Sequence, residues 1–103
     1  MTISMRPIAG GTFVSVHGEL DIESATRLRT ALMEALETCE DGGGLTLDLS
    51  EVAFCDSTGL NALLRARLRA HSEHRSLTIT AASPQVARLL EMTGAARLFA
   101  VTS

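Results

Sequence analysis

Two segments within the first twenty residues have the composition of β-strands, and a pair of glycines separates them. Segments 3–8 and 12–17 are rich in β-branched residues and flank Gly10-Gly11, and in the second segment Val14 and Val16 alternate with residues of the other face. An alternation with a period of two is typical of a strand with one buried face, and glycine accepts the positive φ of a tight turn. The pattern therefore predicts a β-hairpin that turns at Gly10-Gly11.

Farther along the chain, apolar residues recur every three or four positions, which is the spacing of an amphipathic helix. A first helix is predicted after Asp21, which with Glu23 suits the positive end of the helix dipole, and it stops at Gly42-Gly43-Gly44. A second helix is predicted to start near Ser57. The inner face of the first helix comprises Ala25, Leu28, Leu32, Ala35, Leu36 and Cys39. The inner face of the second comprises Leu60, Leu63, Leu64, Leu68 and His71, with Arg65 and Arg69 pointing outward.

A third helix is predicted to begin at Ser83-Pro84, since serine caps helices and proline fits the first helical position, and to end at Gly94. The strands after the hairpin are predicted at 45–49, 77–81 and 98–101, with 52–55 as an apolar connection. The order β-β-α-β-α-β-α-β gives an α/β fold, because strands joined through helices run parallel. We expect a mixed sheet with an N-terminal antiparallel hairpin followed by parallel strands. The pattern leaves open whether helices cover one face or both.

Length and composition narrow the classes of function. A chain of 103 residues with 46% hydrophobic residues fits one domain, 1–103, with one core. The net charge is −3 and all nine basic residues are arginine, so no basic excess indicates nucleic acid or anionic lipid as a partner. No apolar run approaches the ~20 residues of a membrane helix, and no signal peptide is visible. A cytoplasmic location without a membrane partner is therefore expected.

Cysteine and histidine show no pattern of metal ligation. Cys39 and Cys55 lack CxxC spacing and sit among apolar residues, which favours two buried thiols over a disulfide or metal site. His71 and His74 are three residues apart, but no further Cys or His lies close to them in sequence. We expect neither a metal nor a cofactor.

The segment Asp56-Ser57-Thr58-Gly59 lies where the second helix is predicted to begin. Asp56 and Ser57 are both favoured capping residues, and a cap stabilises a helix by about 1 kcal/mol. A serine hydroxyl at a helix start is also exposed, and a phosphate added there would meet free backbone N–H groups and the positive dipole end. Gly59, without a side chain, allows another backbone to approach closely. Capping and a functional site are compatible interpretations of this segment.

Catalysis by the chain itself is not indicated. No histidine lies near Ser57 in sequence and no Gly-x-Ser-x-Gly elbow is present, although a nucleophilic hydrolase needs a base and an orienting acid. The glycine-rich stretches are not followed by the Gly-Lys-Ser/Thr of a phosphate-binding loop. We therefore expect a protein that is not an enzyme.

Several motifs in order resemble the STAS domain of bacterial anti-sigma-factor antagonists. They are Gly18-Glu19-Leu20-Asp21, the strand 45–49, Phe54-Cys55-Asp56-Ser57-Thr58-Gly59-Leu60, and Ser83-Pro84 through Thr93-Gly94. The Asp-Ser-Thr-Gly motif is weak alone, but it is specific in combination with the other segments. The resemblance covers nearly the whole chain.

The resemblance implies a partner and a switch. The partner would be an anti-sigma factor with serine kinase activity, which uses its own ATP to phosphorylate Ser57. Phosphorylation would weaken the complex and a phosphatase would reset it, thereby regulating sigma-factor-dependent transcription. Asp21, Asp56, Thr58 and Gly59 would form the partner-binding surface around Ser57.

Several points stay open at the level of sequence. Leu60 fits either a partner surface or the core, and Arg65 and Arg69 fit either partner contact or a solvated helix face. Chains of this family often continue into another helix after the last strand, whereas this sequence stops at Ser103, which leaves a homodimer open. The alternative function is that of a STAS-like, non-catalytic subunit of a lipid or anion transport complex. A small-molecule sensor is a third hypothesis.

Overall fold

The molecule is built on a five-stranded mixed sheet in the order β1-β2-β3-β4-β5. The structure is a computed structural model that describes residues 1–39 and 42–101. The elements are β1 (Thr2–Ile8), β2 (Gly11–Leu20), α1 (Ile22–Thr38), β3 (Gly44–Cys55), α2 (Ser57–Ser72), β4 (Leu77–Ala82), α3 (Pro84–Thr93), a 3₁₀ turn η1 (Ala95–Arg97) and β5 (Ala100–Val101). Their order confirms the one predicted from the sequence.

Strand directions also follow the prediction. β1 and β2 pair antiparallel as a hairpin with Ile8 opposite Gly11, and Gly10 in the turn has a φ of +84°. β2, β3, β4 and β5 pair in parallel, each joined to the next through a helix. Parallel neighbours require such crossovers, because a tight turn can only join antiparallel strands.

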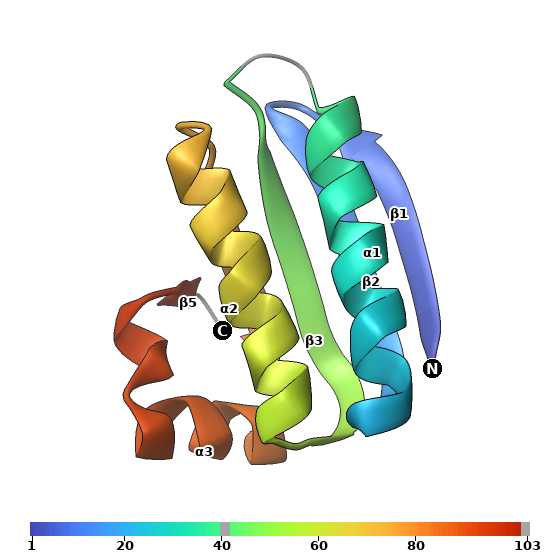
Figure 1. The fold of residues 1–103 in the computed structure, drawn as a ribbon, viewed down its shortest axis with the longest axis vertical. Helices are drawn as coiled ribbons and strands as arrows, with labels where there is room; N and C mark the ends of the chain where they lie inside the picture. The colour runs from blue at the N-terminus through green and yellow to red at the C-terminus, as the bar shows by residue number, and fades with distance from the viewer. Residues whose placement is uncertain (40–41, 102–103) are drawn as a thin grey trace.

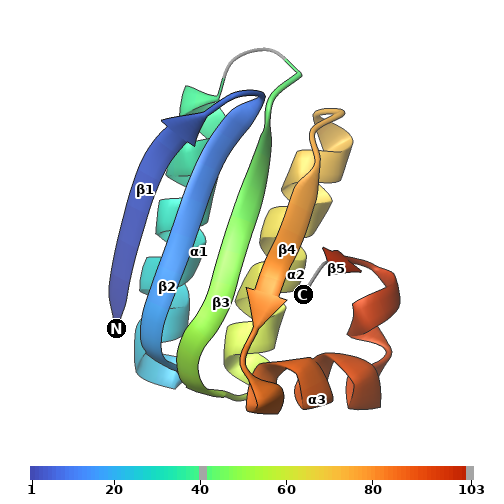
Figure 2. The same ribbon diagram turned by 180° about the vertical axis from the view of Figure 1, so that it is seen from behind.

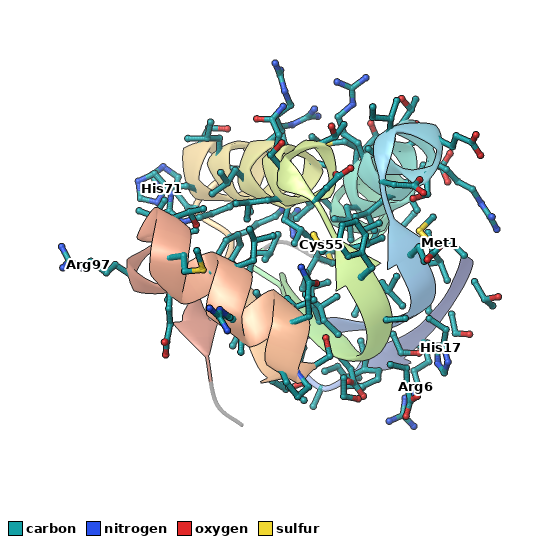
Figure 3. All side chains as sticks on the ribbon, turned by 90° about the horizontal axis from the view of Figure 1, so that it is seen from below. Met1, Arg6, His17, Cys55, His71 and Arg97 are labelled. Atoms are coloured by element: carbon teal, nitrogen blue, oxygen red, sulfur yellow. The ribbon has the colours of Figure 1, made fainter. Side chains whose placement is uncertain are left out.

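The helices form one layer, which answers the question that the sequence left open. α1 and α2 pack side by side on one face of the sheet, and α3 lies across the end of the sheet (Figures 1 and 2). Arg6 and His17 project from the other face, where the described residues place no helix (Figure 3). The largest fully buried side chains lie between the two layers and include Val14, Val16, Leu28, Leu32, Leu47 and Leu63.

The third strand differs from the prediction. β3 is one strand of twelve residues, so the predicted strand at 45–49 and the connection at 52–55 are parts of a single element. Its register against β2 shifts twice, between Ser15 and His17 and between Gly18 and Glu19. Each shift gives β3 one extra residue and resets which side chains face the core. Leu49, Val52 and Cys55 are therefore buried at a spacing of three, which a search for period two does not recognise as a strand.

The inner face of α2 is rotated relative to the prediction. Leu60 and Leu63 are buried as expected, but Leu68 is 62% exposed and His71 is exposed. Small residues occupy the buried positions instead, namely Gly59, Ala62, Ala66 and Ala70. An assignment that counts large apolar side chains as core misses a helix that packs closely through alanine.

Two further predictions were wrong at the ends of elements. Cys39 follows the last residue of α1 as its C-cap and is half-buried, so it is not on the inner face of the helix. The last strand contains only Ala100 and Val101, because the chain before it forms the turn η1. Ser83 caps α3, Pro84 is its first residue, and Gly94 ends it with a φ of +79°, as predicted.

Candidate functional site

The first turns of α1 and α2 start at the same edge of the sheet. Leu20 and Cys55 are register partners at the ends of β2 and β3, and Asp21 and Asp56 follow them directly. The backbone N–H of Asp56 donates a hydrogen bond to the carbonyl oxygen of Leu20 at 3.0 Å. Parallel strands end at a common edge, so both helices begin side by side at the lower end of the molecule in Figure 1. This edge carries the residues that the sequence singled out.

Asp56 is the N-cap of α2. Its Oδ1 accepts hydrogen bonds from the backbone N–H groups of Thr58 at 2.9 Å and Gly59 at 3.0 Å. The capping role expected for Asp56 is thereby confirmed. The expectation that a phosphate would find these helix N–H groups free was wrong for Thr58 and Gly59, because the Asp56 carboxylate occupies both of them.

Ser57 is the first residue of α2, and its side chain is exposed. Thr58, the next residue, is half-buried, whereas Gly59 and Leu60 are buried. The exposed hydroxyl therefore lies on a segment whose following residues are fixed in the core. A charge added to Ser57 would change the surface and leave that core packing in place.

Gly59 contacts the interior of its own chain. A Cβ placed on Gly59 would lie 2.6 Å from the carbonyl oxygen of Leu20 and 3.0 Å from Sγ of Cys55. The backbone that approaches Gly59 is thus that of Leu20. This close contact fixes the position of the helix start.

Asp21 is the N-cap of α1 and forms a reciprocal capping box with Ser24. Its Oδ1 accepts from the N–H of Glu23 at 3.1 Å and of Ser24 at 3.2 Å, and Oγ of Ser24 accepts from the N–H of Asp21 at 2.9 Å. Oγ of Ser24 also donates to the carbonyl oxygen of Glu19 at 2.7 Å. The half-buried Asp21 is thus held rigidly at the same edge as Ser57.

Gln85 ties α3 to this edge and was not found by sequence reasoning. Its side-chain Oε1 accepts from the N–H of Cys55 at 2.8 Å, and its Nε2 donates to the Cys55 carbonyl oxygen at 2.9 Å. The side-chain amide thereby forms the two hydrogen bonds to the backbone of Cys55 that a neighbouring strand would otherwise form. A glutamine near a helix start gives no sequence signal for such a pair across 30 residues.

Cys55 lies in the interior between the helices and the sheet, as Figure 3 shows from this end of the molecule. Burial, with a smaller contribution from the charge of Asp56, raises the pKa of its thiol to about 11. The prediction of a buried thiol is confirmed for Cys55. Cys39 is also a free thiol but is only half-buried.

Comparison with known proteins identifies the family. The family model described as "Mlab, STAS domain" matches residues 8–101. This chain belongs to the STAS domain family. The expected family and fold are thereby confirmed.

Three proteins that are similar to this STAS domain are named for one role. The chain is 32% identical over 81 residues to an anti-sigma-B factor antagonist of Listeria monocytogenes, covering 79% of this chain and 69% of that protein. The same identity and length relate it to an anti-sigma-B factor antagonist of Bacillus subtilis, with coverage of 79% and 72%. A solved structure of an anti-sigma factor antagonist from Mycobacterium paratuberculosis is 28% identical, with a TM-score of 0.84 and coverage of 98% and 84%.

Two apolar side chains of this STAS domain are exposed near the ends of the elements that meet at this edge. Ile22, the first residue of α1, is 75% exposed, and Phe54, next to the end of β3, is 43% exposed. Ile22 stands three residues before buried Ala25, so periodicity would assign it to the core. Its side chain is nevertheless in solvent.

Between residues 1–39 and 42–101, no three His, Cys, Asp or Glu side chains gather closely enough to hold a metal ion. Within the same ranges, none of the helices has the length and apolar character needed to cross a membrane.

Proposed function

We propose that this STAS domain is an anti-sigma-factor antagonist that is switched off by phosphorylation of Ser57. In this proposal residues 1–103 form one non-catalytic domain in the cytoplasm. The domain binds an anti-sigma factor with serine kinase activity, and this binding frees a sigma factor for transcription. The names of the relatives support the role, and the placement of Ser57 supports the switch.

The observation that carries the proposal is the exposure of Ser57 at the first position of a firmly anchored helix. Asp56 caps that helix and Gly59 seats it against Leu20. A kinase can therefore reach the Ser57 hydroxyl without unfolding the segment. The added phosphate carries about −1.5 to −2 charges, which alter the docking surface and leave the core unchanged.

In the proposed transfer, Oγ of Ser57 forms a bond to the γ-phosphorus of ATP held by the partner. The bond between that phosphorus and the ADP oxygen breaks, ADP leaves, and the hydroxyl proton passes to a base of the kinase. A phosphatase later uses water to cleave the phosphate ester, which restores the Ser57 hydroxyl and releases inorganic phosphate. The STAS domain supplies the acceptor oxygen and no catalytic group.

The proposed docking surface surrounds Ser57 at the common start of α1 and α2. Asp21, Asp56 and Thr58 are half-buried there and shape the surface through their backbone bonds. Ile22 and Phe54 supply exposed apolar area of the kind found at interface centres. Phosphorylation weakens the complex because a charged group must then be desolvated within this surface.

Labelling with the cognate kinase tests the modified residue. The unphosphorylated protein is incubated with the kinase-like anti-sigma factor of the same genome and ATP. We expect incorporation of one phosphate into the wild type and none into Ser57→Ala, while Thr58→Ala, which removes the neighbouring hydroxyl, is still labelled. Labelling of Ser57→Ala would reject the site.

Affinity measurements test the switch. Ser57→Asp is expected to bind the anti-sigma factor more weakly than the wild type, and Ser57→Asn serves as the uncharged control of similar size. Equal affinity of the Asp and Asn variants would contradict control by charge. Co-purification with a nucleotide-binding transport subunit, and no kinase partner, would favour the transport-complex alternative instead.

A further inference from the structure

A groove lies between α1 and α2, directly beside the candidate site. Its volume is about 100 Å³. Buried Ala25 and Ala62 lie at the seam between the helices, and the polar lining includes Arg29 from α1 and Thr58, Asn61 and Arg65 from α2. Thr58 connects the groove with Ser57, its neighbour in the chain.

Other arginines of these two helices are already engaged by the chain. Arg27 donates to the carbonyl oxygen of Met1 at 2.8 Å, and Arg67 donates to that of Leu98 at 2.6 Å. Arg69 forms an ion pair with Glu73 one turn farther along α2. Each of these side chains is oriented by a group of its own chain.

Arg29 and Arg65 differ from them. Both are exposed, and neither has a hydrogen bond or ion pair with any residue in the described ranges 1–39 and 42–101. Two cationic side chains from different helices therefore line one groove with no carboxylate of the described chain within 4.0 Å. The groove is complementary to a negatively charged group that the described residues do not supply.

We propose that this groove receives a carboxylate side chain of the anti-sigma-factor partner, paired with Arg29 and Arg65. Guanidinium groups suit this occupant because their forked N–H donors match the two carboxylate oxygens. Thr58 and Asn61 add neutral hydrogen-bonding groups to the lining. The inference rests on the proposed function, since the partner is the one expected to dock around Ser57.

The groove also explains why phosphorylation of Ser57 would weaken the binding of the partner. A phosphate on Ser57 adds about −1.5 to −2 charges next to Thr58, which lines the same groove as Arg29 and Arg65. Like charges at such an interface repel, and the repulsion grows as water is excluded. Phosphorylation therefore opposes the contact that the arginines favour.

The test measures the affinity of the full chain, unphosphorylated, for the cognate anti-sigma factor. Arg29→Gln and Arg65→Gln are each expected to weaken binding about fivefold, the upper range for a partly exposed ion pair. Arg69→Gln is the matched control, because Arg69 lies one turn away on α2 but pairs with Glu73, and it should bind within about twofold of wild type. The double variant Arg29→Gln/Arg65→Gln should also show a shallower dependence of affinity on salt.

Charge reversal identifies the occupant. Arg65→Glu should bind more weakly than Arg65→Gln, and one Asp→Arg or Glu→Arg variant of the partner should restore its binding. Arg65→Lys, which keeps the charge, should retain most of the affinity and shows whether the site tolerates substitution. Restored binding by charge reversal supports the proposal.

The test distinguishes a failure of the proposed function from a failure of the groove proposal. If the wild type does not bind the anti-sigma factor at all, the proposed function fails. If the wild type binds, and the variants Arg29→Gln and Arg65→Gln bind equally well with the same salt dependence, the groove proposal is overturned while the function stands.

Discussion

The backbone N–H of Asp56 donates a hydrogen bond to the carbonyl oxygen of Leu20 at 3.0 Å. This bond continues the contact between β2 and β3 by one residue beyond their last register pair, Leu20 and Cys55. Both strands consequently turn into their helices at the same level. The surface around Ser57 is thus positioned by the main chain.

The cap of α2 can be tested by removing its acceptor. Asp56→Ala leaves the N–H groups of Thr58 and Gly59 without their carboxylate, and we expect a loss of about 1 kcal/mol in the free energy of unfolding. Asp56→Asn keeps an acceptor oxygen and should lose less. Urea denaturation measures both variants. If the Asn and Ala variants are equally destabilised, the charge of Asp56 and not its hydrogen bonds stabilises the helix start.

The close approach of Gly59 to Leu20 predicts a cost for the smallest possible side chain. Gly59→Ala would place Cβ 2.6 Å from the Leu20 carbonyl oxygen, so the start of α2 must shift. Overpacking of this kind destabilises a protein by about 1–3 kcal/mol, although alanine is the better helix former. Asn61→Ala, on the exposed side of the same helix, is the control and should be neutral or stabilising. A Gly59→Ala protein as stable as the wild type would show that the helix start yields easily.

The paired hydrogen bonds of Gln85 with the backbone of Cys55 predict that this side chain stabilises the end of β3. Gln85→Met keeps the length of the side chain but leaves the N–H and carbonyl oxygen of Cys55 without partners. Unsatisfied groups of this kind cost about 1–3 kcal/mol, so the variant should unfold at lower urea concentration.

Hydrogen exchange separates this effect from general loosening. The Cys55 amide should exchange faster in Gln85→Met than in the wild type, while Arg88→Met, an exposed position on the same helix, should leave it unchanged. Unaltered exchange at Cys55 in Gln85→Met would contradict the role of the pair.

Local signals were sufficient for much of this fold. The hairpin, the parallel order and the helix starts at Ser57 and Pro84 were predictable because turn glycines, capping residues and helical spacing act over a few neighbouring residues. The position of Ser57 at a helix start was predictable for the same reason. Asp56 was correctly expected as a cap. The sequence did not show that the Asp56 carboxylate would occupy the N–H groups that were expected to be free for a phosphate.

Features that depend on distant contacts were not predictable. The two register shifts in β3 arise from its pairing with β2. The spacing of buried residues along β3 alone therefore does not identify it as one strand. Leu68 is exposed whereas the alanines of α2 are buried, and the amide of Gln85 reaches a strand end 30 residues away. The pairing of Arg69 with Glu73, by contrast, has the i, i+4 spacing of a helical ion pair, which the sequence does show.

The buried thiol of Cys55 predicts how stability depends on alkaline pH. Burial raises the pKa of this thiol from its ordinary value of 9.0 to about 11. Between these values the unfolded chain has lost the thiol proton while the folded chain retains it. The folded state then binds more protons, so the free energy of unfolding falls as pH rises, by about 3 kcal/mol in total for this group.

The composition of the chain makes this effect measurable. It contains no lysine and no tyrosine, so few other side chains titrate in this window. Urea denaturation at pH 8, 9, 10 and 11 would compare Cys39→Ser with Cys39→Ser/Cys55→Ala. Because both proteins lack the Cys39 thiol, they differ only at Cys55. We expect stability to fall with pH in the protein that retains Cys55 and to fall much less in the double variant, even though the alanine leaves a small cavity and lowers stability at pH 8. Parallel curves for the two proteins would show that Cys55 ionises as easily in the folded state as in the unfolded one, which would contradict its burial beneath the start of α2.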